Sequence, residues 1–305
     1  MRSWGSWVRF AILALVWGSS FLWIKIALDA LSPVQLALAR LALGAGTLVV
    51  LCLATRTRLP RDWRSWLRIG LPALLGNALP FIMFGVGERT VSSGVAGVLN
   101  ATTPLWALLI ALVLRSERRP GWLRLTGLLL GFVGTLVIFA PWQEGGLASG
   151  GALACLIAAL SYAISYTYIG RCLVGTISPI AMSGAQLSLA TGLTALTLPL
   201  GGLDAIHPHG ALPLVAVAVL GIVGTGIAFV LNNRLIADEG ATSASSVGYL
   251  LPVVSVGLGA LVLHEPLSVR VLIGMAVVLV GIALSRRKAD PTPAVVEELA
   301  PAETG

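Results

Sequence analysis

Long apolar stretches separated by short polar segments run through almost the whole chain. The hydrocarbon core of a bilayer is crossed by about 20 apolar residues in a helix. Ten stretches have roughly this length: 8–28, 34–54, 67–87, 92–114, 122–140, 150–170, 179–199, 212–233, 241–263 and 268–285. The segments between them carry Pro, Gly and Arg, which are typical of loops. The pattern predicts an all-α polytopic membrane protein with ten transmembrane helices.

The pattern of residues in the first half is repeated in the second. Pro104 precedes Glu117 by thirteen residues, and Pro252 precedes Glu265 by thirteen residues. Further matched sets are Phe81 with Phe229, Gly127 and Gly134 with Gly274 and Gly281, and Ser32-Pro33 with Ser178-Pro179. Such internal repeats are common in transporters. We expect one five-helix repeat at 1–141, a second at 150–285, and a disordered cytoplasmic tail at 286–305.

The basic residues predict the orientation of the helices. Most Lys and Arg fall in the loops on one side if both termini are cytoplasmic, and Lys25, Arg89 and Arg270 are the exceptions. Cytoplasmic loops of membrane proteins carry an excess of Lys and Arg. Because five spans per repeat is an odd number, the second repeat enters the membrane from the opposite side. The two repeats are therefore expected to be inverted, which is the geometric basis of alternating access.

Composition agrees with a membrane protein. The chain is 57% hydrophobic and 11% charged, whereas soluble domains carry about 25% charged residues. Its net charge of +7 would favour nucleic acid in a soluble protein, but here the Arg residues sit in short loops. We therefore expect contact with anionic membrane lipid and no nucleic-acid binding. His207 and His209 lack further ligands at metal spacing, so neither a metal nor a cofactor is expected.

The paired prolines mark the region where the two repeats are expected to meet. A proline inside a helix frees the carbonyl four residues earlier, here those of Asn100 and Gly248. An unpaired carbonyl is costly in lipid, so both helices should turn this side toward protein or a wet cavity. Pro104, Pro252 and Gly248 are predicted to be bends. The small residues around them are compatible with a solute pathway or with close helix packing.

These residues together resemble the EamA-like branch of the drug/metabolite transporter superfamily. The matching elements are Trp17-Gly18-Ser19-Ser20-Phe21, a Ser-Pro pair followed by Arg40, and the duplicated proline and glutamate spacing. The resemblance implies a ten-helix carrier of two inverted five-helix repeats in a bacterial inner membrane, often an exporter of amino acids or other small metabolites. The second repeat departs from the pattern, because Ser161-Tyr162-Ala163 replaces the Trp-Gly-Ser motif.

Several polar and aromatic side chains inside the predicted spans are candidates for a solute site. The candidates for its walls are Trp17, Asn77, Asn100, Tyr162, Tyr166 and Tyr249. Each is also compatible with plain packing or a helix–helix hydrogen bond. Arg40 is the one charge well inside a span, so it could hold a substrate carboxylate or tie helices together. The carboxylates fall in loops, span ends or the tail, and Glu117 and Glu265 are expected to be structural.

The sequence thus predicts a secondary carrier for a small neutral or zwitterionic metabolite, directed outward. One alternative is a membrane partner that stabilises another protein without transporting anything. Another is an intramembrane enzyme, but the spans offer no buried Asp, Glu or His for acid–base catalysis. The choice between a monomer and a homodimer stays open.

Overall fold

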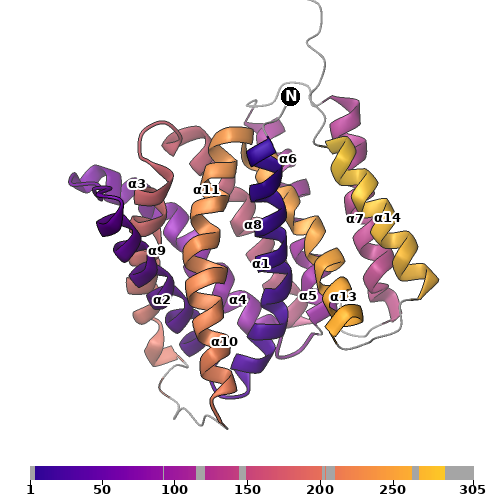
Figure 1. Ribbon diagram of the computed structural model, residues 1–305, viewed down its shortest axis with the longest axis horizontal. Coiled ribbons are helices and arrows are strands. Elements are labelled where there is room, and N and C mark those ends of the chain that lie inside the picture. The colour runs from indigo at the N-terminus through magenta and orange to yellow at the C-terminus, as the bar shows by residue number, and fades with distance from the viewer. Residues whose placement is uncertain are drawn as a thin grey trace, which may run out of the picture.

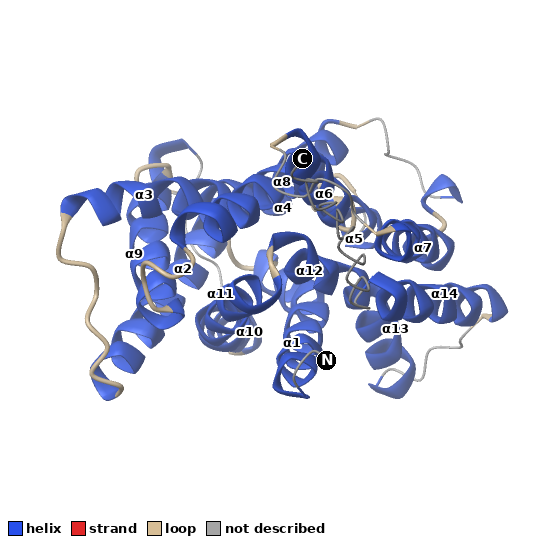
Figure 2. Ribbon diagram, turned by 90° about the horizontal axis from the view of Figure 1, so that it is seen from above, coloured by secondary structure: helices blue, strands red, loops and turns tan. Residues whose placement is uncertain are grey.

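A computed structural model describes residues 4–91, 93–114, 121–143, 149–200, 203, 210–262 and 268–285. These residues form helices and loops and contain no strand (Figures 1 and 2). The α-helices are α1 (Trp4–Leu28), α2 (Pro33–Ala54), α3 (Trp63–Ala73), α4 (Leu79–Gly87), α5 (Ser93–Asn100), α6 (Thr103–Val113), α7 (Trp122–Phe139), α8 (Gly150–Tyr168), α9 (Pro179–Ala195), α10 (Leu212–Gly221), α11 (Ala228–Glu239), α12 (Ala241–Ser245), α13 (Leu250–Val262) and α14 (Val269–Ser285). Three π-helical segments, η1 (Leu74–Ala78), η3 (Ile169–Leu173) and η5 (Ile222–Ile227), and three 3₁₀ segments, η2 (Pro141–Gln143), η4 (Leu198–Leu200) and η6 (Ser246–Tyr249), adjoin them.

Helices cover all ten stretches that the hydropathy pattern predicts. Within the described residues, eight helical stretches are long and apolar enough to cross a membrane, and α14 is a shorter apolar helix. Large apolar side chains point outward from many of them, for example Leu53, Val113 and Leu196, which are all exposed. An outer surface of this kind suits a lipid environment rather than water. The prediction of a polytopic all-α membrane protein is therefore confirmed at this level.

The duplicated Ser-Pro pairs are duplicated helix starts. Ser32 caps α2 by accepting a hydrogen bond from Gln35 N, and the Gln35 side chain accepts one in return from Ser32 N. Ser178 caps α9 in the same way through Ala181 N, at 3.3 Å. Proline follows each cap because its missing N–H and fixed φ suit the first turn of a helix.

Two of the three π-helical segments, η1 and η5, lie at matched places in the two halves. The spacing of 148 residues that relates Phe81 to Phe229 also relates η1 to η5. The wider turn of a π-helix shifts the backbone hydrogen bonds of the helix. Here side chains donate to the carbonyls beside each π-helical segment. Gln186 Nε2 donates to Pro72 O at 3.2 Å, and Thr225 Oγ1 donates to Leu220 O at 2.8 Å. The two accepting carbonyls are again 148 residues apart.

The helix breaks come before the paired prolines rather than at them. Helix α5 ends at Asn100 and α6 begins at Thr103, so Pro104 lies in the first turn of α6. In the second half, η6 ends at Tyr249 and Pro252 lies in the first turn of α13. The Asn100 carbonyl accepts a hydrogen bond from Thr103 Oγ1 at 2.7 Å. The freed backbone group is thus bonded locally, and both breaks fall in the middle of their stretches.

Glycines allow α7 and α14 to pack with their backbones in contact (Figure 2). A Cβ atom at Gly281 would lie 2.5 Å from Gly131 N and 2.7 Å from Gly127 O. A Cβ atom at Gly134 would lie 2.8 Å from Gly274 O. Residue numbers rise along α7 as they fall along α14, so the two helices are antiparallel. Small residues are the usual means of close helix packing in membranes.

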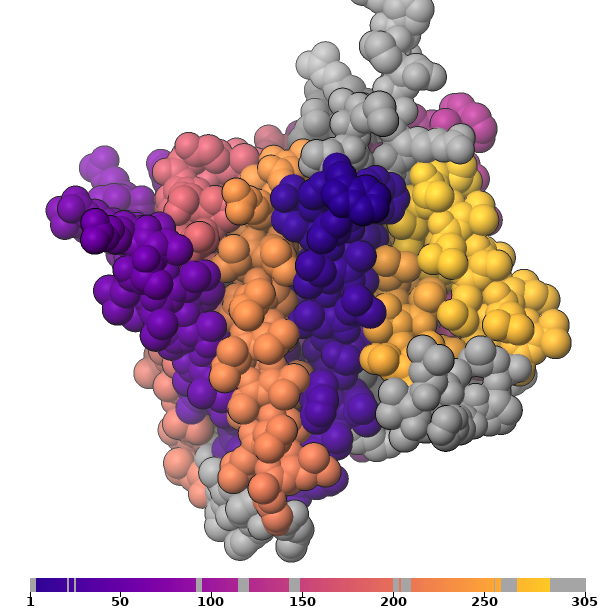
Figure 3. Space-filling model, viewed as in Figure 1, coloured from indigo at the N-terminus to yellow at the C-terminus, as the bar shows by residue number. Residues whose placement is uncertain are grey.

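Helices from the two halves alternate through the rest of the bundle. The α10–η5–α11 rod lies between α2 and α1, as Figures 1 and 3 show. Helix α2 packs on α9, with Gly44 against Leu187 and Gly184 against Leu48 and Cys52. This register makes α2 and α9 antiparallel as well. The halves are therefore not two separate domains but a single interleaved bundle.

Candidate functional site

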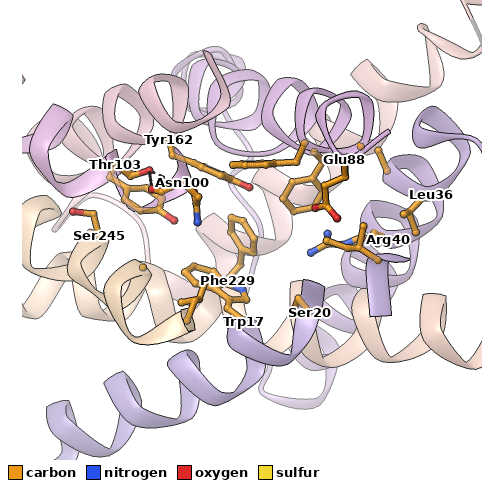
Figure 4. A pocket seen from close by; sticks show the side chains of 18 residues that line it. Trp17, Ser20, Leu36, Arg40, Glu88, Asn100, Thr103, Tyr162, Phe229 and Ser245 are labelled. Carbon is orange, nitrogen blue, oxygen red and sulfur yellow. Dashed lines mark hydrogen bonds between the residues drawn. The ribbon is translucent and has the colours of Figure 1, made fainter. Parts of the chain in front are cut away.

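A cavity lies in the middle of the bundle, between helices of both halves (Figure 4). The space between its walls, its mouth included, is about 940 Å³. Its lining residues are Trp17, Ser20, Ile24, Leu36, Ala37, Arg40, Phe81, Phe84, Gly85, Glu88, Asn100, Thr103, Tyr162, Tyr166, Phe229, Ser245, Gly248 and Leu251. They come from α1, α2, α4 and the residue directly after it, α5, α6, α8, α11, α12, η6 and α13.

Aromatic rings form two walls of this cavity. On one wall, Tyr162 stacks on Phe84 with ring centroids 6.1 Å apart and contacts Tyr166 at 6.0 Å. On the other, Phe229 meets Trp17 at 6.0 Å and Phe81 at 6.2 Å, both edge to face. Ring pairs in these geometries stabilise each other beyond the area that they bury. The walls are therefore stiff as well as apolar.

Two opposite charges face each other at one end of the cavity. Figure 4 shows the Arg40 guanidinium and the Glu88 carboxylate on opposite sides there, and their charges interact. Arg40 lies over the Phe81 ring, with 4.2 Å from Cζ to the ring centroid, and its Nε donates to Thr225 Oγ1 at 3.3 Å. Arg40 is 8% exposed. Arginine suits this setting because it combines a cation–π contact with directed hydrogen bonds.

Small polar groups gather toward the other end. Asn100, Thr103 and Ser245 lie together there in Figure 4. They stand at the breaks between α5 and α6 and between α12 and η6, so the interrupted helices bring them to the cavity. The Trp17 indole is held in one orientation within the aromatic wall, because its Nε1 donates to Gly224 O at 3.0 Å. A solute in the cavity would thus meet charges at one end and neutral polar groups at the other.

The structure brings five of the seven candidate wall residues to this cavity, together with Gly248. These five are Trp17, Arg40, Asn100, Tyr162 and Tyr166. Arg40 was expected either to hold a substrate carboxylate or to tie helices together. In the structure it lines the cavity and also joins α2 to η5 through its hydrogen bond to Thr225.

Asn77 and Tyr249 do not line this cavity. Asn77 is completely buried in η1, where its Oδ1 accepts from Gln186 Nε2 at 2.6 Å. Tyr249 is also completely buried, with its ring against Gly131 of α7. Pro104 and Pro252 are buried in their helices and do not line the cavity. They belong to the breaks that shape it.

Glu88 is the charged cavity residue that the sequence did not reveal. It directly follows α4, so the sequence groups it with the other carboxylates at span ends. Phe81 and Phe229 could have been found, because they are matched positions of the repeat. Glu117, Glu265, His207, His209 and the tail at 286–305 lie outside the described residues. Within the described residues, no three His, Cys, Asp or Glu side chains are close enough together to hold a metal ion.

Comparison with known proteins identifies the family. The model of the EamA-like transporter family matches residues 5–140 and again residues 149–287. The chain therefore belongs to the EamA-like transporter family, and it is a multi-pass membrane transporter rather than an enzyme. Membership also implies that it handles a small-molecule solute.

Relatives agree over nearly the full length. An uncharacterized transporter of Archaeoglobus fulgidus is 28% identical, over 92% of this chain and 99% of its own. YedA, an uncharacterized inner membrane transporter of Escherichia coli, is 30% identical, over 89% of this chain and 87% of its own. A probable terminal-alkyne amino-acid exporter of Streptantibioticus cattleyicolor is 25% identical, over 91% of this chain and 92% of its own. A protein of known crystal structure shares the fold, with a TM-score of 0.77 at 23% identity, over 93% of this chain and 99% of that one.

Proposed function

We propose that this chain is a secondary carrier that exports a small neutral or zwitterionic metabolite across the bacterial inner membrane by alternating access. The observation that carries the proposal is the central cavity, whose aromatic and polar walls come from both halves of the chain. A solute site between two repeats, near the middle of the bundle, is the arrangement that alternating access requires. The inner-membrane location is supported by the relative YedA, which is named an inner membrane transporter.

The carrier has ten spans in two inverted repeats, 1–141 and 150–285. In support, the matched helices α7 and α14 are antiparallel, and so are α2 and α9. Helices related by a two-fold axis in the membrane plane must have opposite directions in this way. The π-helical segments and the mid-stretch breaks also recur at matched places. With an even number of spans and the observed bias of Lys and Arg, both termini are cytoplasmic.

The solute class follows from the charges of the lining. Among the described lining residues, Arg40 supplies one positive charge and Glu88 one negative charge. These two charges sum to zero, so a solute with a net charge would add an uncompensated charge to a low-dielectric site, which is costly. A zwitterion can match both, and an apolar side chain on it would contact the aromatic walls. An amino acid or a similar metabolite has this form.

The outward direction of transport is supported by one of the relatives, which is named as an amino-acid exporter. The cavity reaches the end of the bundle where Leu36, Gly85 and Glu88 lie, and the basic residues place this end on the outer face. We propose that the described structure is an outward-facing form of the carrier.

Transport assays with purified protein in proteoliposomes test the proposal. A panel of labelled amino acids is offered with and without a solute gradient, for the wild type, for Asn100→Ala and for Gly46→Ala. Gly46 is a suitable control, because an added Cβ there would meet nothing within 4 Å. We expect saturable flux of at least one panel member, reduced by Asn100→Ala and unchanged by Gly46→Ala. Flux of no panel member above that of empty liposomes would contradict the proposal.

A second measurement separates a carrier from a membrane partner without transport. A ligand that binds the folded protein raises its apparent melting temperature by mass action. The transported solute should therefore stabilise the purified chain, and Asn100→Ala should weaken this effect. A scaffold would show no stabilisation by any small molecule of the panel.

A further inference from the structure

A buried cluster of polar side chains lies away from the cavity, where α9 packs against η1 and α11. Gln186 is at its centre: Nε2 donates to Asn77 Oδ1 at 2.6 Å, and Oε1 accepts from Asn233 Nδ2 at 3.3 Å. Asn233 Nδ2 also donates to Ser183 Oγ at 2.8 Å. Each of these four side chains is at most 1% exposed. The cluster thus joins the first half, through Asn77, to two helices of the second half.

The repeat relates this closed cluster to the open end of the cavity. The spacing of 146 residues between Ser32-Pro33 and Ser178-Pro179 matches Ala37 to Ser183 and Arg40 to Gln186. Both Ala37 and Arg40 line the cavity.

The same comparison holds for α4 and α11. The spacing of 148 residues matches Gly85, which also lines the cavity, to Asn233. Where the first half has a glycine beside open space, the second half has an amide that bridges to α9. The contact between α2 and α4 is therefore open to the cavity, whereas the equivalent contact between α9 and α11 is closed by side chains.

A second hollow lies directly beyond the cluster. Its lining includes the connection 173–179 between α8 and α9, Met182 and Asn233. Met182 matches Leu36, which lines the central cavity. Because α2 and α9 are antiparallel, the two hollows are at opposite ends of the bundle. Asn233 both lines the second hollow and bonds within the cluster, so it separates this hollow from the interior.

The cluster also holds polar atoms that the closed state does not satisfy. Within the described part of the chain, Asn77 Nδ2 and Asn233 Oδ1 are buried without a hydrogen-bond partner. Each such atom costs free energy while it is kept from water. Water entering at this place would satisfy these groups, which lowers the cost of opening.

We propose that Asn233, with Ser183 and Gln186, forms the cytoplasmic gate of the carrier and that α11 moves away from α9 when it opens. The closed gate is the state in this structure, and the hollow lined by 173–179 is the start of the inner pathway. This inference rests on the proposed carrier function and adds the residues that control access from one face.

Side-specific labelling of a cysteine in the cavity tests the gate. Gly248 is a suitable reporter position, because it lines the cavity and an added Cβ would meet nothing within 4 Å. The background carries Cys172→Ser, which removes the exposed native thiol, whereas Cys52 and Cys155 are buried. A membrane-impermeant thiol reagent is added to right-side-out or inverted membrane vesicles, and the rate of labelling of Gly248→Cys is measured from each face.

Three variants are compared in this background. Asn233→Ala removes both hydrogen bonds to α9, and labelling from the cytoplasmic face should rise about tenfold, the factor for two interhelical hydrogen bonds of average strength in a membrane protein. Ser183→Ala removes one bond and gives the residue found at the matched Ala37, so a rise of about threefold is expected. Ser188→Ala is the control, since Ser188 lies on the same helix as Ser183, matches Ala42 of α2, and donates its hydroxyl within α9, to Gly184 O at 2.8 Å.

The gate is supported if Asn233→Ala and Ser183→Ala speed labelling from the cytoplasmic face alone and Ser188→Ala does not. Unchanged labelling in both gate variants, or an equal rise from both faces, would overturn it. Ser183→Ala keeps the test decisive if Asn233→Ala does not fold. Failure of the carrier function gives a different result, an absence of solute flux in proteoliposomes, while the labelling rates still decide whether the cluster controls access.

Discussion

Replacing Gly281 by alanine tests the contact between α7 and α14, which joins the last helix of each half. The new Cβ would lie 2.5 Å from Gly131 N and 2.7 Å from Gly127 O, whereas ordinary contact begins at 3.4 Å. The overlap with Gly131 N is therefore about 0.9 Å, and the neighbouring atoms are backbone that no rotamer change can move. The two helices must separate along their contact. Overpacking of this kind costs about 1–3 kcal/mol.

Thermal unfolding of the purified protein, followed by tryptophan fluorescence, measures this cost. A loss of about 1–3 kcal/mol corresponds to a fall of about 2–12 °C in the apparent melting temperature of a protein of this size. Gly46→Ala is the matched control on α2, where an added methyl group is in open space. It should leave stability unchanged or raise it by up to about 1 kcal/mol. Equal melting temperatures for Gly281→Ala and Gly46→Ala would refute the reasoning about close packing.

Three further substitutions test the site and one helix start. Arg40→Gln should raise the KM for a carboxylate-bearing solute about 10- to 100-fold, because a hydrogen bond to a charged group contributes about 1.5–3 kcal/mol. Equal KM values in the wild type and the variant would contradict the role of Arg40 in binding. Trp17→Phe loses the bond to Gly224 O and should weaken solute affinity about 2- to 10-fold in calorimetry. Trp106→Phe is its control, since Trp106 Nε1 has no partner among the described residues, and equal losses would argue against the bond. Ser149→Ala removes the N-cap of α8 and should cost about 1 kcal/mol in thermal unfolding, and an unchanged melting temperature would contradict the cap.

Hydropathy located the helices because a bilayer imposes one length on every span. Their interior details depend on tertiary contacts that a single sequence does not display. The π-helical segment at Leu74–Ala78 is an example, since its wide turn is stabilised by Gln186 from a helix more than 100 residues away. The repeat gives part of this information, because η1 and η5 occupy matched places. No local pattern of Leu, Gly and Asn indicates a π-helix by itself.

The site was predicted in part, and the failures have a common reason. Asn77 and Asn100 are both amides inside spans, but one bonds to Gln186 and the other lines the cavity. Which side of a helix faces a neighbour depends on how the helices are rotated in the bundle, and composition does not determine this. Glu88 was missed because a carboxylate at a span end is normally in contact with water. Only the packing of α4 against α2 and α8 shows that it borders the cavity.

Topology mapping at two equivalent loop positions is the most direct test of the inverted repeat. The spacing of 146 residues matches Thr57, which follows α2, to Leu203, which follows α9. Each is replaced by cysteine in a Cys172→Ser background, and intact cells are treated with an impermeant thiol reagent. The account predicts that Leu203→Cys is labelled from outside, whereas Thr57→Cys is labelled only after the membrane is permeabilised. Labelling of both positions from the same face would contradict it.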